Sequence, residues 1–591
     1  MDNLIKERLL TAEVISIRWE RIFLYLDVRL HFSEGADREA EPEFYAVDQE
    51  FFHAGARFQV LGVEDDIYHL KLNVTNNGEN RCVPIGTYSI VVCQGDAQMA
   101  ECETSVEVVG DLESSSRNFL YSKSTRAYTV TFYVEEGDEI LPFRFHILAS
   151  AMTGMNFPQN VLMRNLIHPI KNVQKSWLSK KNFLRRLYAF YTVIYGGKRK
   201  KTVLFMSEQN GVIASNLKAV SDQMKERGLD QEYELLYSAR SASENGHSIK
   251  SWWDMVRKLG KSGTVILDDH APVLDWLHLK EDTKLIQLWH AGAGFKSSGY
   301  SRWGHMGCPG PISCHRQYDF GIAGSKHIAP FFSEVWGIND EQVLATGMPR
   351  MDEYLDETYK SQKTEELYEK YPMCKGKKVI LFAPTYRGKN KIGAYYPYEL
   401  IDFESLYELC GEEYVVLFKM HPWVASKVPI EKKYKDRFAD VGKYPNINDL
   451  FYITDLLITD YSSNIFEYSL MRKPMLFFAF DKIQYSFSRG FHRAYEESAP
   501  GKVCYHFDEV LEAIRTEDFE YEKVEEYIEK HFDYIDSHAS DRVIDWLILG
   551  NLPEEVKEDL VRVEERNKRM RSLNFAPEGY VAPGADKEEE E

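Results

Sequence analysis

Hydrophobic and polar residues alternate in short runs along the first part of the chain, from about Thr11 to Leu148. The alternation has a period of two, the runs are rich in Thr, Val and Tyr, and turn signals such as Asn76-Asn77-Gly78 separate them. This period places one face of each run in a core and the other in water. We therefore predict an antiparallel β-sandwich over residues 1–150. No catalytic group stands out in it, so a packing or oligomerisation role is favoured over binding of a glycan or partner.

From Lys201 onward the pattern changes to apolar runs of buried-strand length, separated by helical or loop segments. The first series of runs comprises 202–207, 233–240, 264–269, 284–290, 318–325 and 342–347, and the second comprises 379–385, 414–420, 456–460 and 474–480. Alternating strands and helices predict parallel sheets. We expect two doubly wound α/β lobes, over 201–350 and 351–550, with the site in the cleft between them.

The segment 151–200 has a helical pattern of its own. Aromatic and aliphatic residues from Phe183 to Ile194 fall on one helical arc, and Arg185 and Arg186 lie outside it. No Asp or Glu occurs between Leu141 and Ser207, although basic residues accumulate there. This composition favours a basic amphipathic helix on an anionic membrane surface. The alternative is a linker helix docked on a neighbouring domain.

Length and composition limit the classes of protein and partner that fit this chain. A chain of 591 residues requires several domains, and a net charge of −20 argues against nucleic acid as a partner. Eight scattered cysteines without a C-x-x-C pair indicate reduced thiols and no structural metal. We find neither a signal peptide nor an apolar run long enough to cross a membrane. Residues 551–591 are expected to form a C-terminal helix and an acidic, disordered tail.

Polar residues follow the predicted strands at one edge of each sheet, where open α/β sheets bind ligands. In the run Ile453 to Glu467, a strand is followed by Asp460, Ser462 and Ser463 and then by a helix. Asn464 and Glu467 have the spacing of an N-cap and its capping-box partner, and a helix start of this kind binds phosphate. The alternative is an ordinary turn whose serines only cap the helix.

Other strand ends carry further polar residues. Arg387 follows the strand 379–385, and His421 with Lys419 follows 414–420. His290 follows 284–289 and precedes a glycine-rich segment whose backbone is able to approach a ligand closely. Taken singly each residue is more often structural, and only their shared edge points to a site.

Five motifs carry a resemblance to a known family. They are LWHAGAGFKSSGYSRWG, TGMPRMD, FAPTYRG, FKMHPWV and TDYSSNIFEYSLMRKPMLFF. In this order they resemble the CDP-glycerol glycerophosphotransferases of teichoic acid synthesis, over about Lys201 to Tyr534. The resemblance implies a GT-B-like pair of lobes at the cytoplasmic face of the cell membrane. It also implies transfer of glycerol phosphate or ribitol phosphate from a CDP-activated donor to a hydroxyl of a lipid-linked or polymeric acceptor, with release of CMP.

The resemblance also suggests roles for single residues. His290 matches the motif histidine proposed as general base, and His421 matches the one placed on the donor pyrophosphate. Arg387 and the turn Asp460-Tyr461-Ser462-Ser463 match donor-binding motifs. An acceptor-side loop with Gly292, Gly294 and Lys296 stands where many members have Thr-Pro-Leu-Lys-Lys. His492 and Arg493 also depart from the usual pattern.

The chemistry of the transfer agrees with these residues. A base must take the proton of the acceptor hydroxyl, and imidazole is suited to this at neutral pH, which makes His290 the candidate. Arg387, His421, Lys419 and the two serines can stabilise charge on the leaving nucleotide without a metal or other cofactor. Glu467 is placed either to accept from ribose hydroxyls or only to cap its helix.

Two other functions remain open at this point. A GT-B glycosyltransferase using a nucleotide sugar would need the same fold and the same sheet edge, and only the motif set argues against it. A non-catalytic scaffold built on the β-domain is opposed by the intact polar motifs. The expected partners are the CDP-polyol donor, the acceptor and an anionic membrane surface, and self-association into a homo-oligomer is compatible with the sequence.

Overall fold

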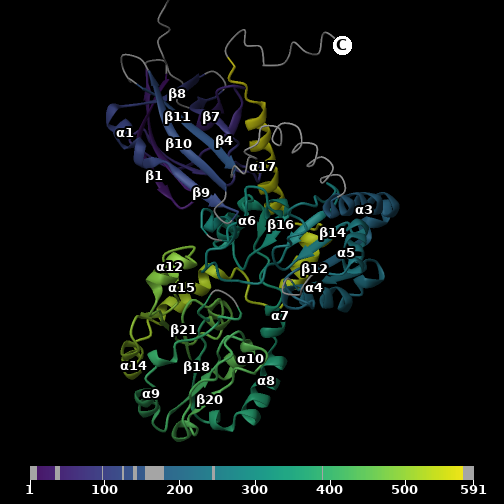
Figure 1. Cartoon of the computed structure of the whole chain (residues 1–591), viewed down its shortest axis with the longest axis vertical. Helices are drawn as coiled ribbons and strands as arrows, with labels where there is room; N and C mark the ends of the chain where they lie inside the picture. Colours follow the sequence, from purple (N-terminus) through teal and green to yellow (C-terminus); the bar gives the residue numbers. More distant parts are fainter. Residues whose placement is uncertain are drawn as a thin grey trace, which may run out of the picture.

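The structure is a computed structural model that describes residues 10–33, 40–95, 98–122, 126–136, 143–153, 179–241, 247–305, 307–388 and 391–576. The strands form one eleven-stranded sheet followed by two six-stranded sheets. The β-domain, the first lobe and the second lobe follow one another along the long axis of the molecule (Figure 1). Among the helices in these ranges, none is both long enough and apolar enough to cross a membrane.

The β-domain contains strands β1 to β11. They are β1 (Leu10–Glu20), β2 (Phe23–Phe32), β3 (Pro42–Asp48), β4 (Ala54–Arg57), β5 (Gln59–Glu64), β6 (Ile67–Asn73), β7 (Gly86–Gln94), β8 (Gln98–Thr104), β9 (Arg117–Tyr121), β10 (Arg126–Glu136) and β11 (Phe143–Thr153). Leu10, Ala12 and Val14 alternate inward along β1, as the period-two pattern predicts. The predicted β-class is confirmed.

One strand pair departs from the antiparallel expectation. All strands join in a single sheet, and β1 pairs with β8 in parallel. β8 returns from β7 as an antiparallel hairpin, with Gln94 opposite Gln98. The direction of β8 is therefore set by that local turn, and its other edge meets β1 running the same way. The sheet is mixed for this reason.

The first lobe is a parallel sheet in the order β13-β12-β14-β15-β16-β17. Its strands are β12 (Thr202–Ser207), β13 (Glu234–Ala239), β14 (Thr264–Leu267), β15 (Lys284–Gln287), β16 (Phe320–Ile322) and β17 (Val343–Leu344). Its longer helices are α4 (Ser215–Glu226), α5 (Ile249–Lys261) and α6 (Ala329–Trp336). Every residue of β12 and β14 is buried, which explains why these strands are apolar without alternation.

The second lobe has the order β20-β19-β18-β21-β22-β23, again all parallel. Its strands are β18 (Lys378–Phe382), β19 (Tyr414–Phe418), β20 (Phe438–Asp440), β21 (Leu456–Thr459), β22 (Met475–Phe478) and β23 (Lys502–Cys504). Chain order reverses between β18 and β21, and ligands of such sheets bind at the carboxyl ends of the strands there. The two predicted doubly wound lobes are confirmed.

The helices of the second lobe begin with α8 (Glu357–Lys370), and its sheet is covered by α9 (Phe403–Cys410) and α14 (Phe507–Thr516). Shorter helices are α7 (Met351–Tyr354), α10 (Ile447–Leu450), α11 (Ile465–Ser469), α12 (Lys482–Ser488) and α13 (Tyr495–Ser498). α15 (Glu522–His531) packs beside α11. The motif turns therefore lie between buried strands and short helices.

The C-terminal helices tie the three parts together. α16 (Ala539–Arg542) and η12 (Val543–Ile548) return to the first lobe, where Asp541 and Asp545 both pair with Arg227 of the α4 end. α17 (Glu554–Ser572) then runs to the β-domain, and Arg569 pairs with Glu43 (Figure 1). The predicted C-terminal helix is present, whereas the predicted disordered tail from residue 577 lies outside the described residues.

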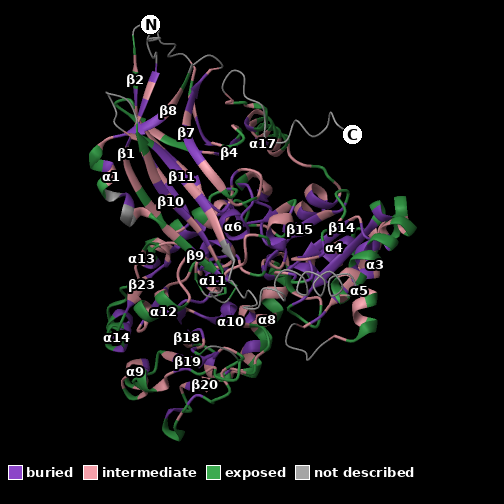
Figure 2. Ribbon diagram, turned by 45° about the horizontal axis from the view of Figure 1, so that its top comes forward, coloured by how far each residue is buried: buried purple, intermediate pink, exposed green. Residues whose placement is uncertain are grey.

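The predicted basic helix is α3 (Lys180–Tyr195), and its apolar arc is divided between two faces. Leu184, Leu187, Tyr188 and Tyr191 are buried in the first-lobe core, so the helix is docked. Phe183, Phe190, Val193 and Ile194 remain exposed (Figure 2). Both the docked and the surface interpretation therefore describe part of this helix. The upstream half of the basic segment, residues 154–178, lies outside the described residues.

Candidate functional site

His290 lies just beyond β15 beside a carboxylate. Its Nδ1 is 3.3 Å from Oδ2 of Asp269, which follows the neighbouring strand β14. The Trp289 ring packs on the imidazole with ring centroids 4.6 Å apart, and Trp289 adopts a positive φ of 51°. Nδ1 is hydrogen-bonded to the Asp268 carbonyl at 3.4 Å, with the Asp269 carboxylate beside it, so Nδ1 carries the proton and Nε2 is the basic atom. Half of the His290 side chain is exposed, so this nitrogen is open to an acceptor.

The neighbouring groups are less suited to act as the base. Asp268 is buried, which keeps its carboxylate away from an acceptor hydroxyl, although the same burial raises the pKa of its carboxyl. Burial also disfavours the charged form of His270, but hydrogen bonds with Asp275 and Cys314 outweigh it and raise the pKa of His270 to about 10. An imidazole with this pKa holds its proton at neutral pH and cannot accept another. The geometry leaves His290 as the candidate.

The glycines of the acceptor-side loop are required by protein packing. A Cβ at Gly292 would lie 2.4 Å from the ring of Phe466, which belongs to the second lobe. A Cβ at Gly294 would lie 2.5 Å from Phe331 of α6. Aromatic rings therefore require glycine at both positions, and a close approach of this backbone to a ligand stays a prediction. The loop forms part of the contact between the lobes.

Cationic groups from both lobes converge at the end of this loop, around Lys296. Lys296 is half-buried, and the loss of solvation, opposed by Asp460 and reinforced by Arg489 and Arg387, lowers its pKa to about 8. Arg489 donates to the Tyr386 hydroxyl at 3.0 Å. A half-buried lysine near two arginines is electrostatically unfavourable unless an anion compensates it. This cluster therefore has the character of a phosphate site.

His421 belongs to the same cluster. Its Nδ1 accepts a hydrogen bond from the backbone N–H of Trp423 at 3.2 Å, so the neutral ring carries its proton on Nε2. Burial, together with Lys296, Lys419 and Arg489, lowers the pKa of His421 to about 4. The ring is thus neutral at pH 7 and is able to donate through Nε2. Lys419 itself donates to the Gly442 carbonyl at 2.8 Å and is buried, so it contributes charge and no direct contact.

Arg387 and Asp460 form an internal ion pair at the reversal of strand order. Asp460 is fully buried and lies 2.9 Å from Arg387 Nη1, and Asp481 takes the Nε side of the same guanidinium at 2.6 Å. Asp460 also accepts from the Thr385 backbone N–H at 2.8 Å. The Arg387 guanidinium is therefore paired with two carboxylates, those of Asp460 and Asp481. Donor binding by Asp460 was predicted, but in this structure its carboxylate is turned to the protein.

The predicted capping box is wrong. Asn464 has helical φ and ψ and no side-chain capping bond, and Glu467 does not reach it. Ser462 instead accepts from the Asn464 backbone N–H at 3.3 Å, and Ser463 is half-buried beside it. Glu467 accepts from Arg350, with Nε to Oε1 at 2.9 Å. The Glu467 carboxylate is therefore engaged by Arg350 and not by the helix start, and its contact with a ribose stays a prediction.

Sequence reasoning missed three residues of this region: Arg350, Asp481 and Arg489. Arg350 stands in the quoted motif TGMPRMD, and Arg489 begins the segment that departs from the family pattern. Their role depends on contacts over 94 or more positions, which no local pattern reports. For Arg350, its place in the motif TGMPRMD was the signal in the sequence that could have indicated a role in the site.

Among the described residues, one group has the donor atoms to hold a metal ion. It comprises His270, Asp275 and Cys314, whose ligand atoms lie within 4.8 Å of one another. Hydrogen bonds already connect them, since His270 Nε2 lies 3.0 Å from Asp275 Oδ1, which also accepts from the Cys314 N–H at 2.9 Å. These hydrogen bonds join residues 270–275, which follow β14, to Cys314.

Comparison with known proteins identifies the family. The family model described as CDP-Glycerol:Poly(glycerophosphate) glycerophosphotransferase matches residues 188–549. The chain is 38% identical over 379 residues to the teichoic acid ribitol-phosphate polymerase TarK of Staphylococcus aureus, covering 63% of this chain and 73% of that one. It is 37% identical over 386 residues to TarL of the same organism, covering 64% and 68%.

A solved structure shares the fold. The wall teichoic acid polymerase TagF aligns with a TM-score of 0.51 at 23% identity, covering 68% of this chain and all of that one. The match to the family model includes both lobes and the loop with His290. This chain belongs to the CDP-glycerol:poly(glycerophosphate) glycerophosphotransferase family and is a polyol-phosphate transferase of teichoic acid synthesis that uses a CDP-activated donor.

Proposed function

We propose that the protein extends a polyol-phosphate polymer and that His290 is the general base. His290 Nε2 takes the proton of the acceptor hydroxyl, and the hydroxyl oxygen attacks the phosphorus that carries the polyol. The bond from that phosphorus to the oxygen of CMP then breaks, and CMP leaves. The observation that carries this proposal is the half-exposed His290 beside Asp269, together with the cationic cluster that contains Lys296 and Arg489.

The donor pyrophosphate is proposed to bind these cations without a divalent metal. Lys296, Arg489 and the Nε2–H of His421 supply charge and hydrogen bonds to oxygens that become more negative in the transition state. His290 of the first lobe then serves the acceptor, and the donor lies between Lys296 of the first lobe and the cations of the second. Activity after removal of divalent ions by a chelator tests this part: loss of turnover that Mg²⁺ restores would overturn it.

Ribitol phosphate is the unit we propose. The two reported relatives are named ribitol-phosphate polymerases, and each covers more than 60% of this chain. A donor panel of CDP-ribitol, CDP-glycerol and UDP-sugars, with a short polymeric acceptor, decides the question by the nucleotide released. We expect CMP from CDP-ribitol at the highest kcat/KM. Release of UDP from a UDP-sugar would instead support a glycosyltransferase.

The protein is proposed to act at the cytoplasmic membrane surface, where a lipid-linked acceptor is available. Support comes from α3, which exposes Phe183, Phe190, Val193 and Ile194 close to the basic residues Lys198 and Lys200. An apolar stripe flanked by lysines is typical of a helix that lies in the headgroup region of an anionic bilayer. The acceptor end and the cleft would then share one surface.

A further inference from the structure

A polar cavity of about 250 Å³ lies where the β-domain, the first lobe and α17 meet, away from the His290 site. Strands β5 and β6, the start of α6 and the far end of α17 each supply part of its wall, and Arg493 of the second lobe closes one side. Four cationic side chains line it against three acidic ones. No step of the proposed transfer uses this cavity.

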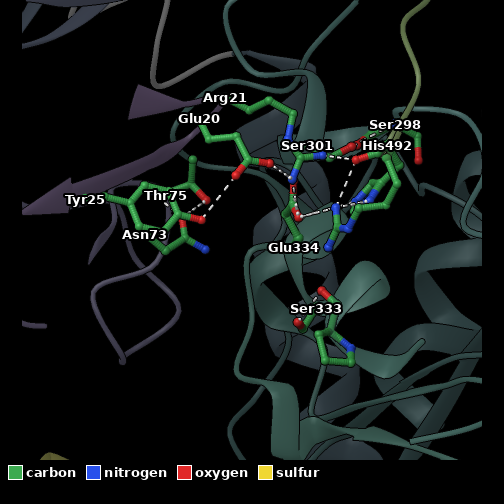
Figure 3. A network of polar contacts seen from close by, with 12 residues as sticks. Glu20, Arg21, Tyr25, Asn73, Thr75, Ser298, Ser301, Ser333, Glu334 and His492 are labelled. Carbon is green, nitrogen blue, oxygen red and sulfur yellow. Dashed lines mark hydrogen bonds and ion pairs between the residues drawn. The ribbon is translucent and has the colours of Figure 1, made fainter. Parts of the chain in front are cut away.

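The acids in this cavity already have partners. Glu334 is held by Arg21 and Arg493 at 3.2 Å each, and Figure 3 shows this junction of the three parts of the chain. Asp340 accepts from the Ser333 hydroxyl, and Glu341 lies 3.6 Å from Arg566. The negative charge of the wall is therefore compensated from within.

The cations retain unused capacity. Lys71 Nζ lies 3.9 Å above the Phe23 ring and has no hydrogen bond or ion pair within the described part of the chain. Burial lowers the pKa of Lys71, although Asp340 and Glu334 partly oppose this. Arg57 Nε is buried and has no partner there. Arg57 pairs with Glu43 through Nη2 at 3.5 Å, which leaves Nε as a buried nitrogen without a partner among the described residues, and an anion in the cavity would satisfy it and pair with Lys71.

Amide groups beside these cations suit hydroxyls. Asn73 uses its Oδ1 to accept from Thr75, and its Nδ2 has no partner in the described ranges. Asn567 uses its Nδ2 to donate to the Gly78 carbonyl at 3.0 Å, and its Oδ1 stays available in the same ranges. Asn73 thus offers a free N–H donor and Asn567 a free acceptor oxygen, the pair that a hydroxyl needs.

The cavity is connected to the acceptor-side loop through residues 490–493. Ser297 N donates to the Gly490 carbonyl at 3.2 Å, and His492 N donates to the Phe295 carbonyl at 3.1 Å. Arg493, the next residue, lines the cavity and pairs with Glu334. A ligand in the cavity therefore contacts a side chain adjacent to the strand-like contact that fixes the loop after His290.

We propose that this cavity binds a polyol-phosphate unit of the acceptor chain, distant from the unit that is being extended. Lys71 and Arg57 hold the phosphodiester, and Asn73 and Asn567 bind polyol hydroxyls. The inference rests on the proposed function, since it takes the acceptor to be a polyol-phosphate polymer. It gives the β-domain a role in retaining the growing chain.

The test is a binding comparison with CMP occupying the donor site. A short poly(ribitol phosphate) oligomer, free ribitol 5-phosphate and inorganic phosphate are titrated calorimetrically into the full chain and its variants. Lys71→Gln is expected to weaken oligomer binding by about tenfold or more, since a charged hydrogen bond is lost. Lys71→Arg should restore it, and Arg126→Gln, which removes a β-domain cation that does not line the cavity, should leave it unchanged.

Equal oligomer affinity of Lys71→Gln and the unaltered protein would overturn the proposal. Free ribitol 5-phosphate or inorganic phosphate bound as tightly as the oligomer would overturn the assignment to the acceptor chain. CMP release with a one-unit acceptor should be unaffected in Lys71→Gln while product chains become shorter. Absence of CMP release from the unaltered protein with every CDP-polyol would instead refute the proposed function. If Lys71→Gln lowers Tm, the comparison is made with Arg57→Gln.

Discussion

Arg350 and Glu467 form an ion pair between the first and the second lobe, and the Arg350 guanidinium also donates to the His290 carbonyl at 3.0 Å. The carboxylate of Glu467 is almost fully buried, with 6% of its side chain exposed. One side chain thus contacts both the second lobe and the backbone of the candidate base.

Arg350→Met is expected to be strongly destabilising because it leaves the Glu467 charge buried without a partner. Such losses are about 3–5 kcal/mol, whereas replacing both partners by apolar residues is often neutral. Urea unfolding of the single variant and of Arg350→Met with Glu467→Met measures this. The control is Arg562→Met, whose ion pair is exposed and should change stability by less than about 1 kcal/mol. Equal effects of Arg350→Met and Arg562→Met would contradict the buried pair.

His290→Ala should reduce turnover by roughly 10² to 10⁴-fold with little change in donor affinity, because the base acts on the acceptor. Asp269→Asn should give a smaller loss of kcat and shift the pH profile, since the carboxylate orients the ring and stabilises its protonated form. Calorimetry with the donor beside a rate assay separates binding from chemistry. Near-normal turnover of His290→Ala would show that another group is the base.

His421→Ala is expected to weaken donor binding and turnover together. Its Nε2–H is positioned for the pyrophosphate because the Trp423 N–H occupies Nδ1. Loss of a hydrogen bond to a charged group costs about 1.5–3 kcal/mol in ground and transition state alike. His506→Ala, on the surface of the second lobe, is the control. A donor Kd that does not respond to His421→Ala would exclude this contact.

Donor affinity should fall at alkaline pH. The pKa of Lys296, lowered to about 8, means that its charge is present below pH 8 and is lost above it. Bound pyrophosphate favours the charged form, so the donor Kd should rise by up to about tenfold per pH unit above 8. Lys296→Arg keeps its charge throughout this range and should give a flat profile between pH 7 and 9.5. A sloping profile in Lys296→Arg would assign the titration elsewhere.

Binding to anionic vesicles should depend on the outer face of α3. A variant with Phe190, Val193 and Ile194 changed to Ser is expected to lose co-sedimentation and keep its fold, since these side chains are exposed. Val561→Ser on α17, also exposed, is the control. High salt should weaken binding as well, because the attraction of Lys198 and Lys200 is screened within about 10 Å at 0.1 M. Unchanged sedimentation of the triple variant would place the membrane contact elsewhere.

Periodicity predicted the elements well wherever strands are fully buried. β12, β14 and β21 fall inside predicted runs because an unbroken apolar run between turn signals has few other structures open to it. β20 and β23, of three residues each, were not predicted. They lie at or near the sheet edges, where partial burial leaves only a weak pattern in the sequence.

The sequence predicted where the candidate site residues lie in the fold, but it did not predict which side chains contact one another. Strand ends located His290, His421 and Arg387 at the correct edges of the sheets. The pairing of Arg387 with Asp481 and of Arg350 with Glu467 was beyond reach, because 94 and 117 positions separate the partners. Local rules therefore assigned Glu467 to a cap that the ion pair prevents.

The docking of α17 on the β-domain has a consequence for synthesis of the protein. β4 is the last strand at one end of the sheet, and Met570 of α17 joins the small cluster around Tyr45 and Ala54 that covers it. Ribosomes add about 5–20 residues per second, so this cover follows the strand by roughly half a minute to two minutes. An uncovered edge strand pairs readily with other chains. The nascent β-domain therefore exposes an aggregation-prone edge until the last helix has left the ribosome.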